Sequence, residues 1–85
     1  MVKKLQRAMQ EIIYFQKLKA IVGEKVFKEG VELARDYLQT LGYRQAKKFF
    51  EVSCRRALLC GDVEEAKKFA VAIEVLEDVK RNQKA

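Results

Sequence analysis

Apolar residues recur at helical spacing along the chain, in segments that glycines separate. Glycines at positions 23, 42 and 61 lie nineteen residues apart. The eighteen residues between two of them would form a helix of about five turns, roughly 27 Å long. Glycine often ends a helix, because it readily adopts the left-handed conformation. The pattern predicts helices over residues 3–22, 24–41, 43–60 and 62–81.

The sequence signals that support these helix boundaries differ in strength. At Gly61, Asp62 can cap the next helix, and Glu65 follows three residues later, as in a capping box. Gly42 lacks a side-chain cap beside it, and Gly23 has the weakest signals. The alternative for the first two segments is therefore one long helix with a kink near Gly23.

Each predicted helix has an apolar face that we expect to be buried. In segment 24–41, Gly30 lies in the middle of this face, which indicates close packing against another helix. In segment 43–60 the face consists of Ala46, Phe49, Phe50, Ser53, Cys54, Ala57 and Cys60. In segment 62–81 it consists of Ala66, Phe69, Ala70, Ile73 and Leu76.

The phrase Ala-Lys-Lys-Phe occurs twice, beginning at Ala46 and at Ala66. In both copies the alanine and the phenylalanine, three residues apart, fall on the predicted core face, and the lysines between them lean outward. We interpret the repeat as a way to begin a bundle helix, because such helices share one polar–apolar pattern. One four-residue identity does not establish a duplication.

The first and last predicted helices are apolar on two sides. A helix of this kind is central, or another chain covers it. Since neither terminal helix should be central in a four-helix monomer, we predict a homodimer with two-fold symmetry. The alternative is a surface with ordinary scattered apolar residues. The predicted contact residues are Tyr14, Leu18, Ile21, Ala72, Val75 and Val79.

Composition supports one all-α domain over residues 1–85. Proline is absent, and serine, threonine and asparagine occur once each, so the chain has few turn formers. No apolar run approaches the length of about 18 residues that spans a membrane, and we expect a cytoplasmic protein. We expect Cys54 and Cys60 to be buried and unpaired. The many charges and few asparagines are typical of a thermophile.

The net charge of +6 is unevenly distributed. Residues 1–23 and 43–60 each carry five basic and one acidic side chain, whereas residues 61–79 carry two basic and six acidic ones. Two basic strips favour binding of nucleic acid or another polyanion. The alternatives are ordinary solvated faces, or pairing with the acidic last helix. The candidate residues are Lys3 and Arg7 on the first helix, and Arg44, Lys48 and Arg55 on the third.

Catalytic chemistry has little support in the sequence. The chain has no histidine, no Gly-rich phosphate loop and no Cys-x-x-Cys motif. Its carboxylates fall on solvated faces or at a helix start, so we expect no catalytic, cofactor or metal site. A DNA-binding helix-turn-helix around Gly42 is disfavoured, because Lys47 and Lys48 stand where its second helix buries an apolar residue.

Two short resemblances to known families occur. The stretch GDVEEAKKFAVAIEVLED, residues 61–78, resembles the second helix of a tetratricopeptide repeat over about a fifth of the chain. However, two glycine intervals give about 38 residues, whereas that repeat has 34. The pair LGYRQA and GDVEEA is similar to ubiquitin-associated domains, with a separation several residues too long. Neither resemblance is specific enough to predict a function for this chain.

We therefore predict an all-α, up-and-down bundle of three to four helices that self-associates. Its expected role is that of a non-catalytic interaction or scaffold module that binds itself and an unidentified protein partner. The alternative is a small basic nucleic-acid-binding protein that uses the outer faces of the first and third helices.

Overall fold

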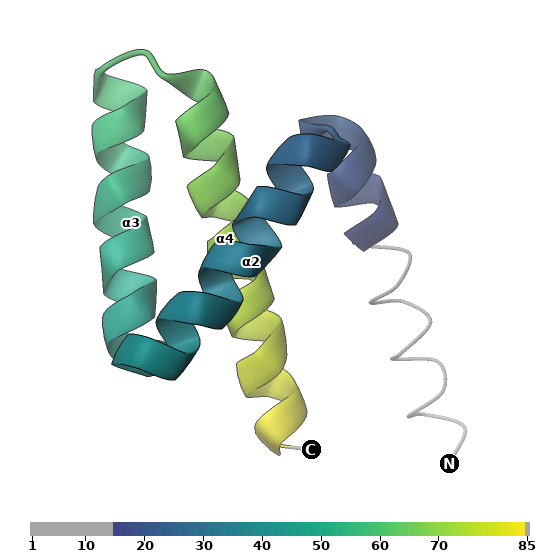
Figure 1. Cartoon of the computed structure of the whole chain (residues 1–85), viewed down its shortest axis with the longest axis vertical. Helices are drawn as coiled ribbons and strands as arrows, with labels where there is room; N and C mark the ends of the chain where they lie inside the picture. Colours follow the sequence, from purple (N-terminus) through teal and green to yellow (C-terminus); the bar gives the residue numbers. More distant parts are fainter. Residues whose placement is uncertain (1–14, 85) are drawn as a thin grey trace.

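The computed structural model describes residues 15–84, which form an all-α helical bundle (Figure 1). Residues 15–22 are helical, and three helices follow: α2 (Glu24–Leu41), α3 (Tyr43–Leu59) and α4 (Val63–Lys84). No strand occurs within residues 15–84. The predicted all-α class is confirmed, and the helix ends inside this range differ from the predicted ones by only a few residues.

Gly23 separates residues 15–22 from α2. Its backbone has φ 94° and ψ 152°, a combination that is essentially restricted to glycine and incompatible with a continuous helix. The chain turns sharply at this point, and the two segments run in different directions (Figure 1). The alternative of one kinked helix is therefore wrong. Gly42, with φ 82° and ψ 168°, separates α2 from α3 in the same way.

α4 is the central helix of the described bundle. α3 and α4 lie side by side as an antiparallel hairpin, and α2 crosses α4 obliquely (Figure 1). α4 packs extensively against both α2 and α3, which share a much smaller contact with each other. The expectation that the last helix lies at an edge is therefore wrong. Two neighbours within the same chain explain why α4 is apolar on two sides.

The core draws one or two residues from each of these three helices. Its buried cluster consists of Ala34 from α2, Ala46 and Phe50 from α3, and Ala72 and Leu76 from α4. The alanines allow the helix backbones to approach closely, while Phe50 and Leu76 fill the space between them. Partly buried apolar side chains, including Leu33 and Tyr37, surround this cluster.

The buried face of α4 is broader than the predicted one, and the predicted residues Phe69 and Ile73 are partly buried against the core. Ala66 and Leu76 are buried as expected, but Val71 and Ala72 are also buried, and Ala70 is exposed. The prediction assumed a single buried stripe. Because α4 packs against two helices, residues on two adjacent faces leave solvent.

Gly30 provides the close helix contact that its position predicted. A Cβ atom at residue 30 would lie only 2.7 Å from the Cβ of Val71 and 2.8 Å from the Lys68 carbonyl oxygen. Real Cβ atoms essentially never approach other atoms so closely. α2 therefore crosses α4 at Gly30, with the Val71 side chain against the bare backbone.

The repeated Ala-Lys-Lys-Phe phrase brings α3 and α4 together. Ala46 and Ala66 are both buried, as predicted. The Phe49 and Phe69 rings meet edge-to-face, with centroids 6.4 Å apart. Phe49 nevertheless remains 41 % exposed, so its predicted burial is only partial.

Candidate functional site

The connection between α3 and α4 is tightly defined by backbone hydrogen bonds. Gly61 has φ 78°, its N–H donates to the Leu58 carbonyl at 3.1 Å, and the Asp62 N–H donates to the Ala57 carbonyl at 2.8 Å. This pair of bonds is the Schellman motif, in which glycine ends a helix in the left-handed conformation. The prediction that Gly61 terminates the third helix is confirmed.

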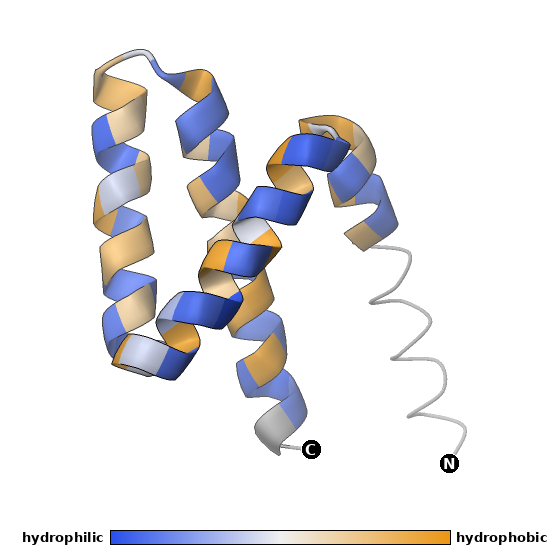
Figure 2. Ribbon diagram, in the orientation of Figure 1, coloured by the Kyte–Doolittle hydropathy of each residue, from blue (hydrophilic) through white to orange (hydrophobic). Residues whose placement is uncertain are grey.

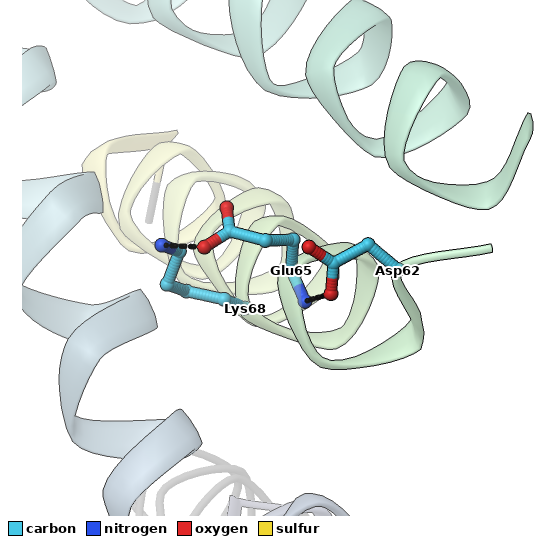
Figure 3. Close-up of polar contacts among 3 residues, drawn as sticks. All are labelled: Asp62, Glu65 and Lys68. Carbon is cyan, nitrogen blue, oxygen red and sulfur yellow. Dashed lines mark hydrogen bonds and ion pairs between the residues drawn. The ribbon is translucent and has the colours of Figure 1, made fainter. Parts of the chain in front are cut away.

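Asp62 then caps α4. The Glu65 N–H donates to Asp62 Oδ1 at 3.2 Å, as predicted (Figure 3). The reciprocal half of a capping box is absent in this part of the chain. The Glu65 carboxylate instead accepts a 2.8 Å bond from Lys68 Nζ, and the Asp62 N–H is already used by Ala57. The connection is therefore held on both sides, by the Schellman bonds and by the cap.

The helix ends on either side of this connection present apolar side chains to solvent. Leu58 is 61 % exposed, Leu59 83 % and Val63 54 %. Hydrophobic and hydrophilic residues alternate along α3, and the helix ends on hydrophobic ones (Figure 2). We call these three residues the hairpin end. Surface apolar residues that occur singly are ordinary, but contiguous ones mark interaction sites.

Charged side chains of both signs adjoin the residues of the hairpin end in the chain. Arg55 and Arg56 precede the leucines on α3, and Asp62 and Glu64 lie beside Val63 at the start of α4. All four residues are exposed. None of them makes an ion pair with another residue in the range 15–84.

The hairpin end was not singled out from the sequence, although a signal was present. Leu58 and Leu59 lie side by side just before Gly61 and outside the predicted core face of their helix. Two adjacent large apolar residues off the core face indicate an exposed patch. Cys60, which was expected to be buried, is exposed beside them, because the helix ends before it completes another inward-facing turn. Cys54 is half-buried, with its Sγ 3.5 Å from the Ala66 carbonyl oxygen.

The residues predicted to form the dimer surface range from fully buried to highly exposed. Ala72 is 0 % exposed and belongs to the core cluster, so its assignment to an intermolecular surface is wrong. Val75 packs against the same cluster, and Val79 is half-buried. Leu18 is half-buried and Ile21 is 75 % exposed, while Tyr14 lies outside the described residues.

The predicted basic residues of α3 share one exposed face. Arg44, Lys48 and Arg55 fall within about 40° of one another around the helix and span about 16 Å along it. All three are exposed and make no ion pair within residues 15–84. We call them the α3 strip. The exposed Glu51 and Val52 lie on the same side of the helix. Lys3 and Arg7, the other half of the prediction, lie outside the described residues.

Lys47 flanks the α3 strip but is bound within the bundle. Its Nζ lies 3.3 Å from the Glu77 Oε1 of α4 and 5.8 Å from the centroid of the Tyr43 ring. The hydrogen bond to Glu77, with a smaller electrostatic effect of Tyr43, raises the pKa of Lys47 above its ordinary value of 10.5. This lysine joins α3 to α4 and is less available to a ligand than the α3 strip.

Neither a metal-binding cluster nor a membrane-spanning helix is found in the described part of the chain. No three His, Cys, Asp or Glu side chains come together there as a metal site. None of the helices in that range has the length and apolar character that a bilayer-spanning segment requires.

Comparisons with known proteins yield no relative: no family model, curated protein or solved structure matches the chain.

Proposed function

We propose that this protein is a non-catalytic helical interaction module that works as a homodimer, and that the two copies meet at the hairpin end. The observation that supports this proposal is the exposure of Leu58, Leu59 and Val63, each more than half exposed, on two helix ends that an ordered connection joins. Burying such residues against a second copy removes apolar surface from water, which contributes roughly 25 cal/mol per Å² before the entropic cost of association is subtracted. The dimer would then serve as a scaffold for an unidentified protein partner.

The pre-formed geometry of the connection favours this use. The Schellman bonds and the Asp62 cap fix the backbone on both sides of the exposed residues. Rigid surface groups lose little conformational entropy when they bind, so more of the apolar contribution remains as affinity. A disordered loop with the same residues would bind more weakly.

The test replaces the leucines with polar residues of similar size. We expect a Leu58→Gln/Leu59→Gln variant to be monomeric by sedimentation velocity at concentrations where the wild type is dimeric. The matched control is Val52→Gln, which changes an exposed apolar residue of α3 outside the hairpin end. Circular dichroism checks that both variants remain helical. If the double variant dimerises like the wild type, the copies meet at another surface.

A second candidate function is binding of nucleic acid along the α3 strip. Three exposed cations without an intramolecular ion pair in residues 15–84 support it, since cations along a helix can follow a phosphate backbone. Glu51 opposes this function, because it places a negative charge on the same side of the helix. We therefore rank nucleic-acid binding below self-association.

Fluorescence anisotropy with a labelled duplex oligonucleotide tests this second function at about 50 and 300 mM salt, the range over which phosphate contacts weaken. We expect Arg44→Gln/Lys48→Gln/Arg55→Gln to bind more weakly and with a salt slope reduced by about three. The control removes the same number of exposed charges from α2, in Lys25→Gln/Lys28→Gln/Arg35→Gln. Equal losses in both variants would indicate a net-charge effect rather than a binding face.

A further inference from the structure

The surface around the hairpin end is complementary to itself. Leu58, Leu59 and Val63 are exposed apolar residues at this end of the hairpin, Arg55 and Arg56 precede the leucines on α3, and Asp62 and Glu64 stand on either side of Val63 in the chain. A two-fold interface uses the same patch on both copies. If one residue of the first copy contacts another residue of the second copy, the same contact forms again with the copies exchanged. Such an interface needs a patch that carries both members of each complementary pair.

We infer that the two copies pair around a two-fold axis, with Arg55 and Arg56 of each copy facing Asp62 and Glu64 of the other. This inference rests on the self-association proposed above and names its partner surface and orientation. The leucines and Val63 then meet at the centre of the interface. The charged pairs lie at its rim, where they set the orientation more than the affinity.

The spacing of the residues fits this arrangement. Arg55 precedes Leu59 by four residues and Arg56 precedes it by three, so both arginines lie on the helix surface next to that leucine. Asp62 and Glu64 stand immediately before and after Val63 in the chain. The basic residues therefore adjoin the leucines at the end of α3, and the acidic residues adjoin Val63 at the start of α4.

A second copy suits this surface better than a polyanion or an anionic membrane. Both of those partners carry one sign of charge and would be repelled by Asp62 and Glu64 beside Val63. The four charges also have no ion-pair partner within residues 15–84 of their own chain. A partner that presents both signs, in the opposite order, satisfies all of them.

Charge exchange tests the orientation directly. Variant A is Arg55→Glu/Arg56→Glu, which makes both sides of the patch acidic. Variant B is Asp62→Asn/Glu64→Lys, which makes the patch basic while asparagine retains the ability to cap α4. We expect the dissociation constant of each homodimer to rise about tenfold or more, because like charges then face each other. The matched control is Lys28→Glu/Arg35→Glu, which reverses two exposed charges on α2.

Mixing the two variants restores complementarity on both sides of the axis. We expect native mass spectrometry of the mixture to show mainly the A–B heterodimer, and the control variant to dimerise like the wild type. If the wild type is dimeric but the mixture forms no more dimer than A or B alone, the orientation is wrong and the proposed self-association stands. If the wild type is monomeric at every concentration, both fail.

Discussion

Gly30 and Val71 are in such close contact that α2 and α4 leave no space for a side chain at residue 30. A Cβ atom there would lie 2.7 Å from both the Cβ and the Cγ1 of Val71. The contact determines how closely α2 can cross the central helix. It also explains how Val71 is fully buried although it lies outside the face predicted from the sequence.

The first prediction concerns this contact. Gly30→Ala should lower the free energy of unfolding by about 1 to 3 kcal/mol, the usual cost of overpacking a core. The sign of this change distinguishes a tight contact from an open position. In an open helix interior, replacing glycine with alanine raises the free energy of unfolding by about 1 kcal/mol. Chemical denaturation would measure the change. Gln39→Ala, at an exposed position of the same helix, is the control and should be neutral or slightly stabilising.

The second prediction concerns the start of α4. Asp62→Ala removes the acceptor of the 3.2 Å bond from the Glu65 N–H and should cost about 1 kcal/mol of stability. Asp62→Asn should cost much less, since asparagine caps helices as well as aspartate does. Thermal unfolding of the two variants would separate them. Equal losses would show that the charge of Asp62, rather than its cap, stabilises the helix.

The third prediction is a pH dependence from Lys47. The pKa of this lysine is raised in the folded protein by its bond to Glu77, so folding favours the protonated form. The stabilisation is fully present below the ordinary value of 10.5 and is lost as the pH rises through the higher, folded-state pKa. Lys47→Met should therefore lower the melting temperature at neutral pH, and the difference from the wild type should shrink as the pH rises above 10.5. A difference that is constant with pH would contradict this role of the ammonium group.

The fourth prediction uses the exposed Cys60 as a reporter of the dimer. Cys60 adjoins Leu59 in the connection, so the two copies of this thiol lie close to each other in the proposed pair. A flexible bismaleimide should cross-link the wild type efficiently at low protein concentration. Cys60→Ser should abolish the product, whereas Cys54→Ser should retain it, because Cys54 is half-buried. If variant A cross-links as fast as the wild type, the reaction reports random collision.

The helix boundaries were predictable because their signals are local. The glycines at 23, 42 and 61 all have positive φ, and the acceptor that caps α4 is the aspartate next to Gly61. The buried alanines of the repeated phrase also follow from a pattern within one helix. Propensity and capping act over a few residues, and a single sequence contains that information.

The arrangement of the helices was less predictable, because it depends on contacts between distant segments. The apolar residues on a second side of α4 indicated that something covers this side, but not whether the cover is a helix of the same chain or a second chain. Because α4 is central, Ala72 belongs to the core of the bundle and not to the predicted dimer surface. The exposure of Leu58 and Leu59 likewise depends on how much of α3 its neighbours cover, although their place outside the core face gave a partial signal.

The central claim is that the protein is a dimer, and the molar mass of the wild type tests it most directly. Multi-angle light scattering after size exclusion, over a dilution series at moderate salt, would give this mass. We predict a value twice the 9.9 kDa of one chain at high concentration, with a reversible decrease toward 9.9 kDa on dilution. A constant mass of 9.9 kDa at every concentration would contradict the claim.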